Sequence, residues 1–141
     1  MKFMTEKVFI DSNIFIYAYT GDDEQKHSIA RDLLRNSVLN DEIILSVQIL
    51  NEFYSVMVKY NYPHNGIKSC LNEIIEQVKV MPLALETVKR CIFIKEKYSY
   101  SWWDSLVLAS ALENDCAILY SEDLQGNQII ENKLKIVNPF V

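Results

Sequence analysis

Acidic side chains that follow short apolar segments are the residues of this sequence best suited to do chemistry. Asp11 directly follows "VFI", and Glu122 and Asp123 follow "AILYS". Glu52 comes one turn after the segment "EIILS", and Asp104 opens a long apolar stretch. Two unit charges about 4 Å apart at an effective dielectric near 20 repel each other by about 4 kcal/mol. If the fold gathers these carboxylates, we therefore expect a cation among them.

The ligand types indicate which cation this would be. Oxygen ligands select hard divalent ions, Mg²⁺ or Mn²⁺, rather than zinc. The chain has two histidines, and its three cysteines are far apart and outside any CxxC pattern. These numbers argue against a zinc site and against a disulfide framework. A metal site at the acids is therefore predicted to hold Mg²⁺ or Mn²⁺.

Each acid also has an explanation that involves no metal. Asp11 is placed to cap a following helix, a role worth about 1 kcal/mol. Glu52 lies on a polar stripe at helical spacing, which is typical of a solvated helix face. Asp104 follows Ser101 in "SWWD", which fits a capping-box pattern. The case for a metal site therefore depends on the joint placement of the acids.

Strands that alternate with helices must position these side chains. Continuous apolar runs predict strands at 8–10, 42–46 and 116–121, with two more candidates around Val80 and in "KIVNPF". Helical patterns cover 12–19, 24–39, 47–60, 65–77, 85–98 and 102–114. This alternation predicts an α/β fold, a three-layer α/β/α sandwich with a central, mainly parallel sheet. Ligands of such sheets gather beyond the carboxyl ends of the strands, where the acids fall.

Length and composition favour one domain spanning residues 1–141. Half of the 141 residues are hydrophobic, which is enough for a single core. The formal net charge of -5 gives no general attraction to nucleic acid, so an RNA substrate would need local positive charge. The N-terminus lacks the features of a secretory signal, and no apolar stretch approaches the roughly 20 residues of a membrane span. We therefore expect a cytoplasmic protein with no membrane segment.

Four separated blocks carry a family likeness: "FIDSNIFIYAY", "LSVQILNEFYSVMVKY", "SYSWWDSLVLASALENDCAILYSEDLQ" and "KLKIVNPF". In order and spacing they resemble PIN-domain proteins, most closely the VapC-type toxins of prokaryotic toxin-antitoxin pairs. The resemblance implies a PIN-like α/β/α fold and an Mg²⁺- or Mn²⁺-dependent endoribonuclease that acts through metal-activated water. It also implies inhibition by a cognate antitoxin protein, and it suggests a homodimer.

The resemblance also assigns roles to individual residues. The family's catalytic, metal-binding acids fall on Asp11, Glu52, Asp104 and Asp123. Its supporting polar positions fall on Asn13 and Ser121, the latter being Thr in many members. Glu122 is an alternative to Asp123 if the loop turns differently. Asp115 is expected at the opposite edge of the sheet.

Two other functions stay open on the sequence alone. One is a PIN-like binding module that has lost catalysis and only pairs with a partner. The other is a phosphotransfer or phosphatase-like α/β domain, although a phosphatase-like motif would place a second Asp where Asn13 stands.

Basic and aromatic residues outside the acid set receive no site role from the sequence. The basic candidates for RNA contact are Lys26, Arg31, Arg35 and Lys59, which are also typical of solvated helix faces. The aromatic cluster comprises Tyr98, Tyr100, Trp102 and Trp103. Such a cluster can stack on bases, but we expect core packing or an oligomer contact.

Overall fold

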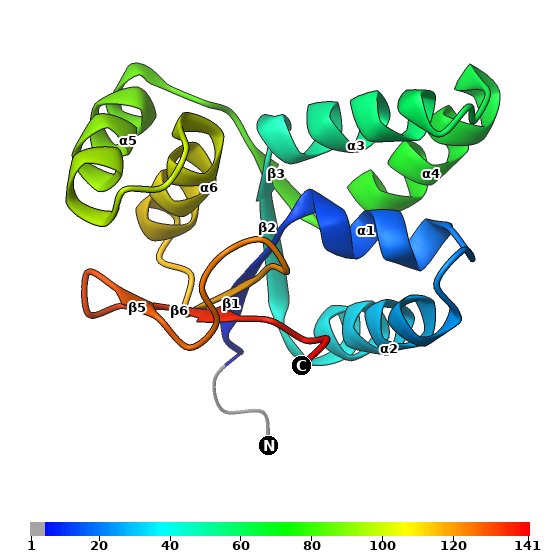
Figure 1. The fold of residues 1–141 in the computed structure, drawn as a ribbon, viewed down its shortest axis with the longest axis horizontal. Helices are drawn as coiled ribbons and strands as arrows, with labels where there is room; N and C mark the ends of the chain where they lie inside the picture. The colour runs from blue at the N-terminus through cyan, green and yellow to red at the C-terminus, as the bar shows by residue number, and fades with distance from the viewer. Residues whose placement is uncertain (1–4) are drawn as a thin grey trace.

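The computed structural model describes residues 5–141, and its centre is a six-stranded sheet (Figure 1). The strands are β1 (Lys7–Ile10), β2 (Glu42–Ser46), β3 (Lys79–Met81), β4 (Ile118–Tyr120), β5 (Ile129–Ile130) and β6 (Leu134–Val137). Their order is β3-β2-β1-β4-β6-β5, and only the β5–β6 pair is antiparallel. The predicted mainly parallel α/β fold is therefore confirmed.

Helices cover both faces of the sheet. They are α1 (Ser12–Tyr19), α2 (Glu24–Asn40), α3 (Val47–Lys59), α4 (His64–Gln77), α5 (Leu85–Tyr98) and α6 (Trp102–Glu113). The connections β1 to β2 and β2 to β3 step one way across the sheet, whereas β3 to β4 steps back past β1. Because parallel crossovers are right-handed, α1–α4 lie on one face and α5–α6 on the other, as Figure 1 shows.

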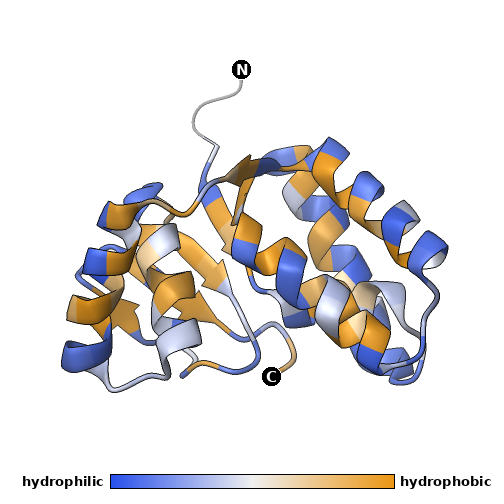
Figure 2. Ribbon diagram, turned by 90° about the horizontal axis from the view of Figure 1, so that it is seen from above, coloured by the Kyte–Doolittle hydropathy of each residue, from blue (hydrophilic) through white to orange (hydrophobic). Residues whose placement is uncertain are grey.

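The apolar strands form the middle of the core. Val8, Phe9 and Ile10 of β1 have no exposed surface, as expected for a parallel strand covered on both faces. Figure 2 shows mostly hydrophobic strands between helices of mixed hydropathy. Helix α6, the long apolar stretch that Asp104 opens, is buried at every position from Ser105 to Leu112. No helix within residues 5–141 combines the length and apolarity that a membrane span requires.

The predicted elements differ from the observed ones mainly at their ends. The strand candidates around Val80 and in "KIVNPF" correspond to β3 and β6. Helix ends are displaced by one residue, as at Asn40 and Lys59, which is ordinary fraying. Strand β5 was not predicted, because two residues that pair antiparallel at the edge of the sheet leave no periodic pattern in the sequence.

Candidate metal centre

The predicted site lies where β1 and β4 end side by side. The chain leaves β1 toward one edge of the sheet and leaves β4 toward the other edge. The carboxyl ends of these neighbouring parallel strands therefore form a topological switch point. The backbone N–H of Asp11 donates to the carbonyl oxygen of Tyr120 across 2.9 Å, which brings Asp11 beside the residues that follow β4. Switch points of this kind are where open α/β sheets bind ligands.

Asp11 is both a helix cap and a buried carboxylate. Its side chain is 5% exposed, and Oδ1 accepts a hydrogen bond of 2.8 Å from the backbone N–H of Ser12. The predicted capping role is therefore confirmed. Oδ2 accepts a second bond of 2.8 Å from the hydroxyl of Ser121. Burial raises the pKa of Asp11 to about 6 despite these two bonds, and the negative charges of Asp123 and Asp104 add to the rise.

Asn13 and Ser121 connect Asp11 to Asp123. Nδ2 of Asn13 donates to Oδ2 of Asp123 at 3.1 Å and to Oγ of Ser121 at 3.5 Å. The Ser121 hydroxyl also accepts from the backbone N–H of Asp123 at 3.2 Å. The turn after β4 is fixed further because the N–H of Glu122 donates to Oδ1 of Asn13 at 3.3 Å. Four of the predicted site residues thus form one hydrogen-bonded group.

Glu122, the alternative to Asp123, is engaged elsewhere. Its carboxylate accepts a hydrogen bond of 2.7 Å from the hydroxyl of Tyr17 and forms an ion pair with Lys26. The Lys26 ammonium also lies over the rings of Tyr17 and Phe140, 4.9 and 5.4 Å from their centroids. These contacts compensate the Glu122 charge, whereas Asp123 has no ion pair among the described residues, which favours Asp123 as the metal-binding acid. Sequence reasoning missed the pair because its members are 96 positions apart.

Glu52 approaches the same edge from α3. The sequence left a solvated helix face as the alternative to a site role, and Glu52 is half-buried. Burial raises its pKa to about 7, with the charges of Asp11 and Asp104 contributing in the same direction. Nε2 of Gln48 donates to Glu52 Oε2 at 3.4 Å and to the carbonyl oxygen of Trp103 at 3.0 Å. Gln48 thereby links α3 to the start of α6.

Asp104 lies in the first turn of α6. Its backbone N–H donates to the hydroxyl of Ser101 at 3.1 Å, so the predicted cap is present. Burial raises the pKa of the Asp104 carboxyl, and the charge of Asp123 adds to this effect. The preceding Trp103 is 61% exposed, so core packing, one of the two roles expected for the aromatic cluster, does not apply to it. The buried face of α6 begins only at Ser105.

The electrostatics of the four acids fit a hard divalent cation. None of the ion pairs in residues 5–141 involves these acids. Three of the acids, Asp11, Glu52 and Asp104, have raised pKa values. Uncompensated oxygen ligands of this type suit Mg²⁺ or Mn²⁺. Within the same residues, however, no three His, Cys, Asp or Glu side chains already stand close enough to hold an ion. Three or more of these acids could therefore ligate one ion only after their side chains move.

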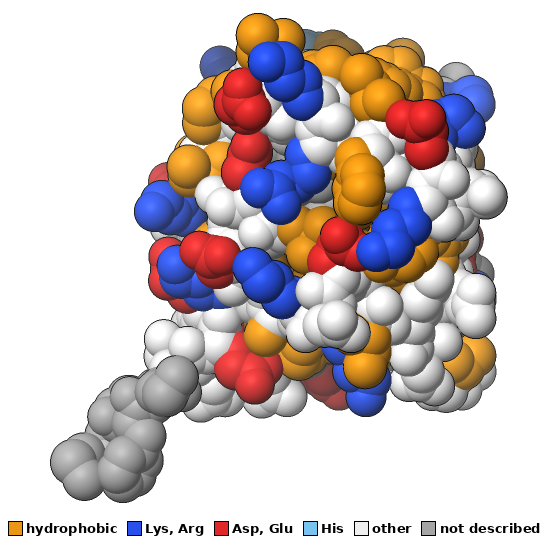
Figure 3. All heavy atoms as spheres, turned by 90° about the vertical axis from the view of Figure 1, so that its left-hand side faces the viewer, with side chains coloured by type: hydrophobic (Ala, Val, Ile, Leu, Met, Phe, Trp, Pro, Cys, Tyr) orange, Lys and Arg blue, Asp and Glu red, His pale blue; other side chains and the backbone are white. Residues whose placement is uncertain are grey.

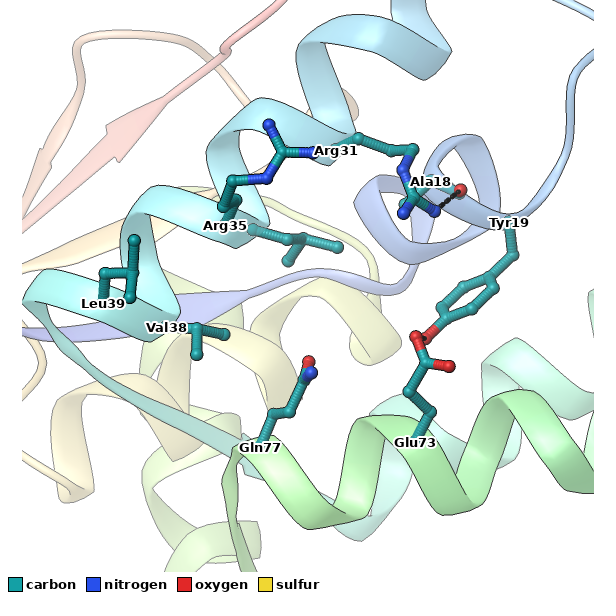
Figure 4. Close-up of a pocket in the computed structure, with 9 residues that line it drawn as sticks. Ala18, Tyr19, Arg31, Arg35, Val38, Leu39, Glu73 and Gln77 are labelled. Atoms are coloured by element: carbon teal, nitrogen blue, oxygen red, sulfur yellow. Dashed lines mark hydrogen bonds between the residues drawn. The ribbon is translucent and has the colours of Figure 1, made fainter.

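A separate hollow of about 250 Å³ lies between α1, α2 and α4 (Figure 4). The hydroxyl of Tyr19 donates to Glu73 at 2.7 Å, and Nη1 of Arg31 donates to the carbonyl oxygen of Ala18 at 3.5 Å. Arg35 lines the same hollow. None of the four acids borders it, so these two arginines do not belong to the acidic edge.

The fold and this acidic edge define an α/β domain with a candidate metal centre at its switch point. The family model of the PIN domain matches residues 8–129. This chain therefore belongs to the PIN-domain family. Comparison with curated protein sequences finds no significant match.

Solved structures of toxins and toxin-antitoxin complexes are similar to this chain. VapC20 of Mycobacterium tuberculosis, a sarcin-ricin-loop-cleaving toxin, superposes with a TM-score of 0.68 at 14% identity over 82% of this chain and 91% of its own. VapBC2 of Rickettsia felis, bound to promoter DNA, gives a TM-score of 0.71 at 14% identity, covering 94% and 99%. A Klebsiella pneumoniae toxin-antitoxin complex gives 0.71 at 16% identity, covering 94% and 97%. At these identities the likeness establishes the shared fold.

Proposed function

We propose that this protein is a divalent-metal-dependent endoribonuclease and the toxin of a toxin-antitoxin pair. The observation that carries the proposal is the hydrogen-bonded connection of Asp11 to Asp123 at the switch point of a PIN-domain sheet. Glu52 and Asp104 lie near enough for their charges to act on the same group. The fold shared with a toxin that cleaves the sarcin-ricin loop supports RNA as the substrate.

The residues of the site would have different roles in metal binding and catalysis. The four acids Asp11, Glu52, Asp104 and Asp123 would hold Mg²⁺ or Mn²⁺. When bound, such an ion supplies activation of a water molecule and positive charge at the scissile phosphodiester. Ser121 and Asn13 hold the carboxylates of Asp11 and Asp123 in place, as supporting hydrogen bonds commonly do for metal ligands. Glu52, which accepts a hydrogen bond from Gln48, would either ligate the ion or orient the attacking water.

The partners follow from the same proposal. Two similar structures contain toxin-antitoxin complexes, which supports a cognate antitoxin that covers the acidic edge. We also propose a homodimer that acts on RNA in the cytoplasm. The net charge of -5 does not prevent RNA binding, because the ions add positive charge where the phosphate reacts. A short upstream reading frame for a small DNA-binding protein would support the toxin assignment over a housekeeping nuclease.

RNA cleavage by the purified protein tests the proposal. We expect the wild type to cut single-stranded or structured RNA with Mg²⁺ or Mn²⁺ and to stop in chelator. Asp11→Asn should lose cleavage, whereas Asp115→Asn, in the loop before β4 at the opposite edge, should keep it. A wild type that binds an antitoxin but cuts no RNA with either ion would instead indicate a catalytically inactive PIN-like binding module.

A further inference from the structure

A cleft of about 400 Å³ lies between α3 and the start of α6. It is lined by Val47, Gln48 and Glu52 of α3, together with Leu83 and Trp103. Its volume lies within the range of ligand pockets, roughly 300–1,000 Å³. Of the four acids, Glu52 lines this cleft, so the cleft adjoins the candidate metal centre at that residue.

Trp103 presents an unused aromatic surface at the cleft. Its side chain is 61% exposed, although it sits in the first turn of a helix that is otherwise buried. Trp103 lines the cleft together with Glu52, one of the four acids. Aromatic side chains that stand beside a strand-binding site are platforms on which unpaired bases stack.

Gln48 bonds to the backbone beside this surface and has one unpaired, buried acceptor. Its side chain is 6% exposed, and its Nε2 donates to the backbone of Trp103 and to Glu52. Its Oε1 is buried and has no hydrogen-bond partner among residues 5–141. A buried acceptor without a donor is costly. The amino group of a base seated in the cleft would supply that donor.

We propose that Trp103 stacks on an unpaired nucleobase of the RNA strand whose phosphate lies at the acids. This inference rests on the proposed ribonuclease function. The occupant is a nucleotide because the cleft is continuous with the acids through Glu52, so a strand held there carries its neighbouring base to the indole. The base must be unpaired, since a base inside a duplex has no free face to stack. Trp103 is then a residue that contacts the substrate and selects single-stranded or flipped-out positions.

Binding of a cleavage-resistant RNA tests this contact independently of catalysis. The probe is a short, single-stranded oligoribonucleotide of mixed sequence with phosphorothioate linkages, labelled for fluorescence anisotropy, with Mg²⁺ present. Trp103→Ala should weaken binding about tenfold, and Trp103→Phe should retain most of it. The matched control is Phe93→Ala, which removes another exposed aromatic, 50% exposed, on α5. This control should bind as the wild type does.

The control lies on α5 and does not line the cleft. The ammonium of Lys97 lies 5.6 Å from the centre of the Phe93 ring. Helix α5 stands at the left of Figure 1, and the face on that side, seen directly in Figure 3, mixes acidic, basic and hydrophobic side chains.

The outcomes separate this inference from the proposed function. An oligomer of abasic ribose phosphate should bind the wild type and Trp103→Ala equally, because no base remains to stack. Equal binding of the full RNA by Trp103→Ala and wild type would overturn the base contact even if the enzyme cuts RNA. No binding by wild type, or a change of oligomeric mass in Trp103→Ala, would overturn it as well. Binding through Trp103 without any cleavage would leave the contact standing and refute the nuclease.

Discussion

The hydroxyl of Ser121 donates a 2.8 Å hydrogen bond to Oδ2 of Asp11, although the two residues are 110 positions apart. The contact exists because β1 and β4 are parallel neighbours and both end at this edge. It ties the first acid of the chain to the loop that carries Asp123. The acidic edge is therefore assembled by the sheet rather than by any local stretch of sequence.

Ser121→Ala should lower the free energy of unfolding by about 1–3 kcal/mol, because it leaves a buried oxygen of Asp11 without its donor. Ser121→Thr should stay close to wild type, since Thr supplies the same hydroxyl. Urea denaturation monitored by circular dichroism measures both. Equal stability of the Ala and Thr variants would show that the Ser121–Asp11 hydrogen bond does not contribute to the free energy of unfolding.

Stability of the ion-free protein should fall as pH rises. The pKa of Asp11 is raised from 3.8 to about 6 and that of Glu52 from 4.5 to about 7. Between about pH 4 and 7 the folded chain therefore binds more protons than the unfolded chain, and stability drops across that window. For Asp11 the loss is on the order of 3 kcal/mol.

Urea denaturation in chelator from about pH 5 to about pH 8 measures this slope. Asp11→Asn should have a shallower slope, because its side chain does not titrate. A wild type whose stability rises steadily over that range would contradict the burial of uncompensated carboxylates.

The two neighbouring acids after β4, Glu122 and Asp123, should differ sharply in their effect on RNA cleavage. Asp123→Asn should reduce RNA cleavage more than about 100-fold, beyond the loss typical of a residue that only supports a metal ligand. Glu122→Gln should keep cleavage within a few-fold, because Glu122 is paired with Lys26 and Tyr17. Initial cleavage rates at saturating Mg²⁺ compare the two. The reverse ranking would transfer the metal-binding role to Glu122.

Gln48 should contribute to RNA cleavage although it carries no charge. Gln48→Leu keeps the approximate volume but removes the hydrogen bonds to Glu52 and to the carbonyl oxygen of Trp103. We expect cleavage to fall about tenfold, as for supporting residues of metal sites. The matched control is Asn114→Leu at the far end of α6, whose side-chain bond is local, to the carbonyl oxygen of Ser110. If both variants cleave alike, Gln48 does not position the site.

The sequence predicts those parts of the site that depend on local pattern. The cap at Asp11, the cap at Ser101 and the positions of the acids after strands are all readable from residue type and spacing. The same patterns predict the strands and helices, because buried parallel strands are continuous apolar runs. The hydrogen bond between Ser121 and Asp11 follows only once strand order is known.

Other features depend on contacts that no spacing encodes. Glu52 belongs to a polar stripe, yet it is half-buried, and Gln48, which donates to the carbonyl oxygen of Trp103, is almost fully buried. Trp103 lies in an apolar stretch, but it is exposed in the first turn of α6. Neither exposure follows from residue type and spacing within one helix.

Direct measurement of metal binding tests the central claim that the four acids form one site. Calorimetric titration of the purified protein with Mn²⁺ should show binding by wild type and by the opposite-edge control Asp115→Asn. Asp115 has a positive φ of 57°, a conformation that Asn also tolerates, so this control should fold normally. Asp11→Asn and Asp123→Asn, each folded by circular dichroism, should lose that binding. Unchanged Mn²⁺ affinity in both Asp11→Asn and Asp123→Asn would contradict the metal centre.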